Sequence, residues 1–154
     1  MDAAVLRAAF ACFPTGVTAL AGLVSGKPAG MAVSSFASVS LEPPLIAASI
    51  QRTSTTWPML RDAAALGVSV LAEHHGEVGR RLSGPGDRFA GVDWTTSQSE
   101  AVFIQGATAW FECVLHQEVP AGDHVIALLK VTAVECRSSS RPLVFHGSGF
   151  RQLA

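Results

Sequence analysis

The chain has 154 residues, of which 49% are hydrophobic and 15% charged, and its formal net charge is −1. This length is typical of one domain with a sizeable core, so we expect a single domain over residues 1–154. Nucleic-acid binding is disfavoured, because such proteins usually carry a basic patch and here Lys and Arg are scattered. So apolar a composition also predicts a homodimer, since obligate interfaces resemble a domain core.

The chain contains three cysteines, Cys12, Cys113 and Cys136, and no CxxC pair. An odd count without metal-ligand spacing favours free thiols over a disulfide framework or a zinc site. The first residues lack the basic segment and the long apolar run of a signal peptide, and no apolar stretch reaches the length of a membrane span. These features predict a soluble cytoplasmic protein.

The first half of the chain alternates short apolar runs with turn residues. Residues 2–13 predict a helix with Asp2 as its N-cap, ended by Pro14 and Gly16. Ser and Thr at the start and Pro58 in the first turn predict a second helix over residues 54–65. Strands are predicted over residues 17–24, 30–36, 45–50 and 67–71.

The second half contains the clearest hairpin of the sequence. Residues 107–119 and 124–135 predict two long strands around a turn at residues 120–123, with opposing residue numbers that sum to about 243. In this register Cys113 and Cys136 do not face each other. The other expected elements are one or two helical turns at residues 77–82, a glycine-rich loop at 84–91, a turn at 138–140, a strand at 143–146 and a tail at 150–153.

Six or seven strands with a few short helices do not alternate as a parallel sheet requires. The sequence therefore predicts a mainly β protein with short helices, an antiparallel barrel or sandwich. No GxSxG, HExxH or Walker loop occurs. His74 and His75 are adjacent, so on a strand they would point to opposite faces, and nothing in the sequence indicates a metal site.

Two hydroxyl-rich segments, residues 34–40 and 49–56, carry the strongest chemical signal. Hydroxyls and free backbone N–H groups at the start of the helix predicted over residues 54–65 would suit a phosphate, and Arg52 would add a positive charge. The same residues serve equally well as caps and turn residues, so both interpretations stay open. His124, which follows a Gly-Asp turn, and Phe150 are each either structural or part of a site.

Six blocks of the sequence, in order, resemble those of a known family. They are FPTGVT at residues 13–18, GMAVSSFASVS at 30–40 with PPL after it, Ser54-Thr55 with Leu60, RFAGVDW at 88–94, GDH at 122–124, and PLVF with Gly147 and Phe150 after it. Together they are similar to the flavin reductase-like family of the FMN-binding split barrel, over nearly the whole chain.

The resemblance implies an antiparallel split β-barrel that reduces FMN or FAD with NADH, or with NADPH, and supplies reduced flavin to a partner monooxygenase. It implies that His124 positions the nicotinamide. The residues that it implies for flavin binding are Ala32, Val33, Ser34, Ser35, Ser49, Gln51, Ser54, Thr55 and Phe150. Hydride transfer takes place between two cofactors, so the absence of an evident acid–base pair agrees with this function.

Three positions depart from the family pattern: Ala32 replaces a common Thr, Ser34 a common Asn, and Leu129 a Gly. The first two changes remove or shorten hydrogen-bonding side chains, which leaves the choice between FMN and FAD open. Two other functions are consistent with the sequence. One is a non-catalytic split-barrel protein that carries or senses flavin or haem, and the other is a structural β-domain.

Overall fold

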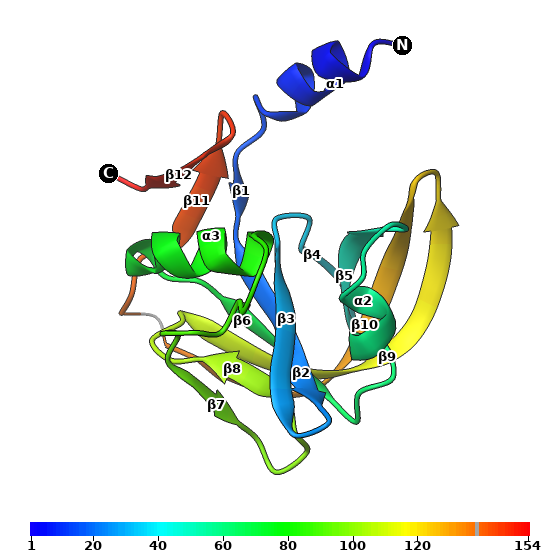
Figure 1. The fold of residues 1–154 in the computed structure, drawn as a ribbon, viewed down its shortest axis with the longest axis vertical. Helices are drawn as coiled ribbons and strands as arrows, with labels where there is room; N and C mark the ends of the chain where they lie inside the picture. The colour runs from blue at the N-terminus through cyan, green and yellow to red at the C-terminus, as the bar shows by residue number, and fades with distance from the viewer. Residues whose placement is uncertain (138) are drawn as a thin grey trace.

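Short antiparallel strands dominate the part of the chain that this computed structural model describes, residues 1–137 and 139–154 (Figure 1). The four helices are α1 (Ala3–Phe10), α2 (Trp57–Leu60), the 3-10 turn η1 (Glu73–His75) and α3 (Gly76–Ser83). The twelve strands are β1 (Thr15–Gly16), β2 (Thr18–Val24), β3 (Lys27–Val33), β4 (Ala37–Leu41), β5 (Pro44–Gln51), β6 (Leu66–Val70), β7 (Trp94–Thr96), β8 (Val102–Ile104), β9 (Ala109–Ala121), β10 (His124–Cys136), β11 (Leu143–His146) and β12 (Gly149–Gln152). The prediction of a mainly β protein with short helices is confirmed.

Seven strands form one sheet in the order β3-β2-β6-β9-β10-β5-β4, and every pairing in it is antiparallel. The sheet is not closed into a barrel, because β3 and β4 lie at its two ends and are not paired with each other. The segment from residue 34 to residue 36 nevertheless joins these two strands directly. The chain therefore crosses the opening of the sheet between β3 and β4.

Strand β2 lies between two apolar layers, as its side chains show. Leu20 packs in the cluster that contains Trp57 and Leu60, whereas Ala19 and Ala21 pack in the cluster that contains Leu82. Successive strand residues point to opposite faces, so β2 is buried on both. Helix α2 thus covers one face of this strand and α3 covers the other, which brings both helices beside the opening of the sheet.

The predicted long hairpin is confirmed, with a slightly different register. His124 pairs with Ala121, so opposing numbers sum to 245 near the turn, and two irregularities interrupt the ladder. The turn consists of Gly122 and Asp123 alone, and Gly122 adopts a φ of 65° that favours glycine in such a turn. Cys113 pairs with Val131 and Cys136 with Ala109, so the two thiols do not face each other, as expected.

All three cysteines are free thiols. Burial raises the pKa of the Cys113 thiol to about 12, and the charge of the neighbouring Glu112 adds to this effect. Because the thiolate is the reactive form, Cys113 is an inert core residue.

Two predicted helices differ from the structure in length. Asp2 is the N-cap of α1, as predicted, and its carboxylate accepts a hydrogen bond of 2.8 Å from the Ala4 N–H, but the helix ends at Phe10. The helix predicted over residues 54–65 is wrong in extent, because α2 is a single turn. The chain after Leu60 must reach the pairing of Leu66 with Cys113 at the start of β6, and Ala65 is buried on the way.

The structure adds strands that the sequence did not predict: β1, β4, β7, β8 and β12. Four of them are only two to four residues long, too short for a clear periodic pattern. The turn predicted at 138–140 includes Ser138, which lies outside the described residues. No helix among the described residues is long and apolar enough to cross a membrane; a cytoplasmic location stays a prediction.

Candidate functional site

A cavity of about 510 Å³ opens where the chain leaves β3 toward β4 and passes the end of β5. Its walls come from the end of β3, the end of β5, the loop before α2, the end of α3 and the start of β10. The lining residues are Met31, Ala32, Val33, Ser34, Ser35, Ser49, Ile50, Gln51, Thr53, Ser54, Thr55, Thr56, Leu82, Ser83, Arg88 and His124. The two hydroxyl-rich segments therefore converge on one site together with His124.

The first segment crosses the opening and is held there by Ser35. The Ser35 hydroxyl accepts a hydrogen bond of 2.8 Å from the Ser49 N–H and donates one of 3.2 Å to the Ser49 carbonyl. This pair of bonds fixes the 34–36 segment against β5. Ser34, which is exposed at the cavity, makes no side-chain hydrogen bond to the described residues, so its hydroxyl is free to bind a ligand.

The second segment supplies hydroxyls from the loop that enters α2. The Ser54 hydroxyl accepts a hydrogen bond of 3.1 Å from the N–H of Trp57, the first residue of α2, whose N-cap is Thr56. Ser54 therefore has a structural role in the turn before α2 and also lines the cavity. Thr55 is exposed at the cavity, whereas Thr56 is buried.

The positive charge at this end of the cavity comes from Arg88, which the sequence analysis did not single out as a site residue. Its Nε donates to the Gly84 carbonyl at 2.7 Å, and its Nη1 donates to the Gly30 carbonyl at 3.0 Å and to the Thr56 hydroxyl at 3.2 Å. Its Nη2 has no hydrogen-bond partner among the described residues, and a guanidinium carries two N–H donors there. The only sequence signal for Arg88 is its place in the RFAGVDW block.

Arg52 was predicted to supply this charge, and the structure contradicts that prediction. The Arg52 Nε donates to the Gly122 carbonyl at 2.8 Å, and its backbone N–H donates to the Asp123 carbonyl at 3.0 Å. Arg52 is exposed and does not line the cavity. It instead fastens the Gly-Asp turn to β5, because β10 returns beside β5 and brings that turn within reach. The helix dipole contributes little, since α2 has only four residues.

His124 stands at the first position of β10, directly opposite Gln51 at the end of β5. Its Nδ1 lies 2.7 Å from the Asp123 Oδ1, so the imidazole donates from this nitrogen and Nε2 is left for a ligand. The hydrogen bond and the charge of His124 hold the pKa of the exposed Asp123 carboxyl below its usual value. Asp123 thereby orients the ring at the edge of the cavity.

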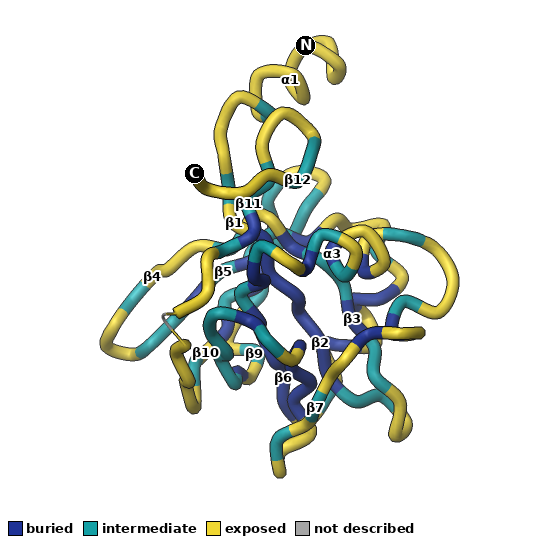
Figure 2. Tube along the Cα trace, turned by 90° about the vertical axis from the view of Figure 1, so that its left-hand side faces the viewer, coloured by how far each residue is buried: buried dark blue, intermediate teal, exposed yellow. Residues whose placement is uncertain are grey.

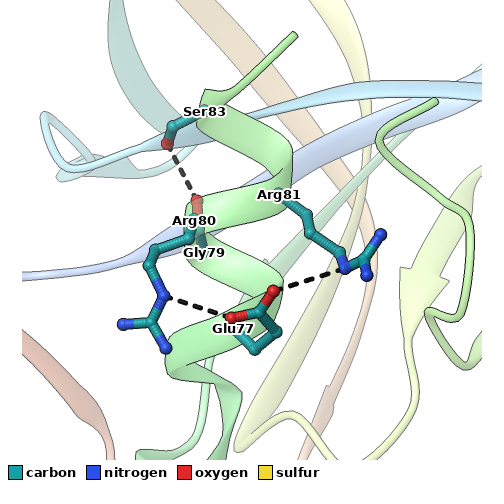
Figure 3. Close-up of polar contacts among 5 residues, drawn as sticks. All are labelled: Glu77, Gly79, Arg80, Arg81 and Ser83. Atoms are coloured by element: carbon teal, nitrogen blue, oxygen red, sulfur yellow. Dashed lines mark hydrogen bonds and ion pairs between the residues drawn. The ribbon is translucent and has the colours of Figure 1, made fainter. Parts of the chain in front are cut away.

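Phe150, like Arg52, is a predicted site residue that does not line the cavity. Its ring packs on α3 at Gly79, where a Cβ atom would lie 2.8 Å from the ring, and forms a tilted pair with Phe145. Figure 3 shows how α3 is organised beside it: Glu77 binds Arg80 and Arg81, and the Ser83 hydroxyl donates to the Gly79 carbonyl at 2.9 Å. A role for Phe150 at the nicotinamide side stays a prediction.

His75 is buried away from this site, and both ring nitrogens are engaged. Nδ1 accepts from the Ala72 N–H at 2.9 Å, and Nε2 lies 3.0 Å from the Gln105 carbonyl, to which it donates. Burial lowers the pKa of His75, and the neighbouring His74 lowers it further. His75 is therefore a neutral structural residue, and neither ring nitrogen has a lone pair left to bind a metal.

Two of the departures from the family pattern lie in the cavity and one does not. Ala32 and Ser34 line the cavity. The two departures therefore change side chains that a ligand in the cavity would contact. Leu129 is fully buried in the core cluster. Its side chain therefore affects packing of the sheet and makes no contact with the cavity.

The mainly antiparallel fold and the hydroxyl-lined cavity agree with the flavin reductase-like family, which the sequence blocks resemble. The profile of the flavin reductase like domain matches residues 10–154. The chain is 37% identical over 152 residues to a flavin reductase of Pseudomonas putida, covering 97% of this chain and 89% of the relative. It is 41% identical over 128 residues to the reductase component of the flavin-dependent trigonelline monooxygenase of Acinetobacter baylyi, covering 82% of this chain and 41% of the relative.

A solved structure with the same fold is the NADH:FAD oxidoreductase SgcE6 of Streptomyces globisporus C-1027, in complex with NAD and FAD fragments. The TM-score is 0.93 at 34% identity, and the match covers 99% of this chain and 93% of SgcE6. This chain belongs to the flavin reductase-like family.

Proposed function

We propose that residues 1–154 act as one domain that reduces FMN or FAD with NADH or NADPH and supplies reduced flavin to a partner monooxygenase. The observation that carries the proposal is the convergence of the two hydroxyl segments, Arg88 and His124 on one cavity. Relatives that are flavin reductases or reductase components of monooxygenases support it.

The residues of the cavity fit a flavin by their chemistry. Met31 and Ala32, which are partly exposed, provide apolar surface for a flat ring, and the serine and threonine hydroxyls suit a polyhydroxyl chain. The free Nη2 of Arg88 suits a phosphate. We assign flavin binding to Ala32, Val33, Ser34, Ser35, Ser49, Gln51, Ser54 and Thr55, and we add Arg88.

A flavin bound in this cavity would supply the redox chemistry, as the acceptor for the hydride of the nicotinamide. The chain's own residues bind and orient. Ser35 holds the 34–36 segment across the opening, Arg88 fixes the phosphate end, and His124, oriented by Asp123, positions the nicotinamide. Orienting two reactants in contact is a large part of the rate enhancement that such a protein needs to provide.

Homodimer formation is also part of the proposal. All eight residues of α1 are exposed, among them Val5 at 61% and Phe10 at 67%, and Figures 1 and 2 show this helix projecting from the body. Phe13, three residues after the end of this helix, is 73% exposed. A second copy that covers this helix would explain why its apolar side chains are exposed and find no cover among residues 1–137 and 139–154. A monomeric mass in sedimentation at micromolar concentration would refute this point.

One experiment tests the function: the purified protein is mixed with NADH and either FMN or FAD, and absorbance at the nicotinamide band is followed. We expect loss of the band only when flavin is present. A protein that binds flavin without oxidising NADH would be a carrier or sensor, and one that binds no flavin would be a structural domain. Hydroxylation of substrate by an added monooxygenase component, dependent on this chain, would report transfer of reduced flavin.

A further inference from the structure

The loop at residues 51–57 leads from β5 into α2 and supplies a large part of the cavity wall. Its lining residues are Gln51, Thr53, Ser54, Thr55 and Thr56. Backbone bonds hold the end of the loop that leaves β5. Gln51 pairs with His124 in the β5–β10 ladder, and the Arg52 N–H donates to the Asp123 carbonyl. The sheet and the adjoining turn therefore fix this end, whichever side chains it carries.

The other end of the loop is held by a side chain that lies outside the cavity. The Trp57 Nε1 donates to the Glu118 Oε1 on β9 at 2.6 Å, and Trp57 is only 5% exposed in the core. The Glu118 Oε2 lies 2.9 Å from the Arg61 Nη2. None of these three residues lines the cavity. Glu118 thus joins β9 to α2 without standing where a ligand would bind.

Two further hydrogen bonds connect Trp57 to the cavity. The Ser54 hydroxyl accepts from the Trp57 N–H at 3.1 Å. Thr56, the residue before Trp57, accepts with its hydroxyl from the Arg88 Nη1 at 3.2 Å. A displacement of Trp57 would therefore shift Ser54 and Arg88, the groups that we assign to the flavin phosphate.

We propose that Glu118 is a positioning residue for flavin binding, which acts through Trp57 to hold the phosphate end of the loop in place. This inference rests on the proposed flavin cavity. An indole has a single N–H donor, and a carboxylate is a stronger acceptor than a neutral group. Because Trp57 is buried, removal of the acceptor leaves its N–H unpaired, which is more costly than the loss of an ordinary exposed hydrogen bond.

The ion pair with Arg61 provides a control for this role. Arg61 is the C-cap residue of α2, and its side chain is 47% exposed, against 22% for that of Glu118. Exposed ion pairs contribute little, because water and salt screen them. The position of the loop should therefore depend on the bond to the indole and hardly on the ion pair.

The first measurement compares FMN and riboflavin affinities by fluorescence titration in three variants. We expect Glu118→Ala to bind FMN about tenfold more weakly, the effect of one hydrogen bond to a charged group. Riboflavin, which has no phosphate, should change less than about threefold. Glu118→Gln keeps an oxygen that can accept from the indole, and Arg61→Gln removes only the ion pair. Both should therefore bind FMN within about threefold of the unmodified protein.

The second measurement asks whether Glu118 acts through the indole. Trp57→Phe removes the N–H but keeps an aromatic ring in the core, and it gives the same comparison if Glu118→Ala does not fold. The double variant Trp57→Phe/Glu118→Ala should bind FMN no more weakly than the weaker single variant, because both changes break one bond. Single effects that multiply in the double variant would overturn the inference.

Steady-state kinetics and thermal unfolding separate positioning from a purely structural role. We expect Glu118→Ala to raise the KM for FMN about tenfold at an unchanged kcat, because the groups that meet the nicotinamide stay in place. If Glu118→Ala lowers the unfolding temperature but binds FMN as tightly as the unmodified protein, Glu118 is only structural, and the proposed function still stands. If the unmodified protein oxidises no NADH with either flavin, the proposed function falls and the inference with it.

Discussion

Replacement of Arg88 by Gln tests a site residue that the structure identified and the sequence analysis did not. The side chain loses the free Nη2 donors and the positive charge that we assign to the flavin phosphate. A hydrogen bond to a charged group contributes about 1.5–3 kcal/mol, so the loss of about 2 kcal/mol corresponds to an approximately thirtyfold weaker affinity for FMN. Riboflavin has no phosphate, and we expect its affinity to change less than about threefold, within the few-tenths range of indirect effects.

Titration of both flavins by fluorescence quenching gives the two affinities, and thermal unfolding shows how far the fold is affected. Arg88 also joins Gly84, Gly30 and Thr56, so its loss should lower the free energy of unfolding by about 2 kcal/mol as well. Arg52→Gln is the matched control, because this arginine binds Gly122 outside the cavity and should leave FMN affinity nearly unchanged. If riboflavin and FMN weaken by the same factor in Arg88→Gln, the arginine does not bind the phosphate.

Four further changes test other parts of the argument. His124→Ala should raise the KM for NADH or lower turnover at little cost in flavin affinity; if both kinetic parameters stay the same, the nicotinamide role is wrong. Ser54→Ala should weaken flavin binding by about 1–2 kcal/mol and, through the lost hydrogen bond from the Trp57 N–H, lower stability by about 1 kcal/mol, while Ser54→Thr keeps a hydroxyl for both roles; unchanged flavin affinity in a titration removes Ser54 from the phosphate site. Gly67→Ala should lower the free energy of unfolding by at least about 3 kcal/mol in chemical denaturation, because the new Cβ would clash with the Val102 carbonyl oxygen, whereas Gly16→Ala, with open space around it, should cost little; similar midpoints for the two would contradict the packing. Since the pKa of His75 is lowered in the fold, the unfolded chain takes up a proton first, so stability should be full above pH 6.5 and decline as pH falls below it; His75→Gln should flatten this part of the profile, and an unaltered profile would show that another group causes it.

Much of the local structure followed from the sequence because its causes are local. Apolar periodicity and turn residues predicted the hairpin around Gly122 and Asp123, the N-cap at Asp2 and the strand over residues 143–146. The same reasoning failed for the helix over residues 54–65. Helix-forming residues continue there, but the pairing of β6 with β9 takes the chain away after one turn.

The candidate site was predicted in part for a similar reason. Hydroxyl-rich segments and the histidine after a Gly-Asp turn are visible as residue types, so the sequence identified most of the residues that line the cavity. The sequence could not say which arginine supplies the charge. Arg52 lies within the second hydroxyl-rich segment, yet its side chain binds the Gly122 carbonyl. Arg88 comes from a loop 58 residues after Gly30, whose carbonyl it binds.

The amino-acid sequence by itself determined the antiparallel class of the fold, the long hairpin, the family resemblance and the two polar segments, because each depends on residues close together in the chain. Only the tertiary structure decided that the sheet stays open, that the 34–36 segment crosses the opening, and that Arg88 supplies the positive charge at the cavity. These features depend on contacts between residues far apart in sequence, and such contacts are set by the packing of β2 between two apolar layers rather than by any local pattern.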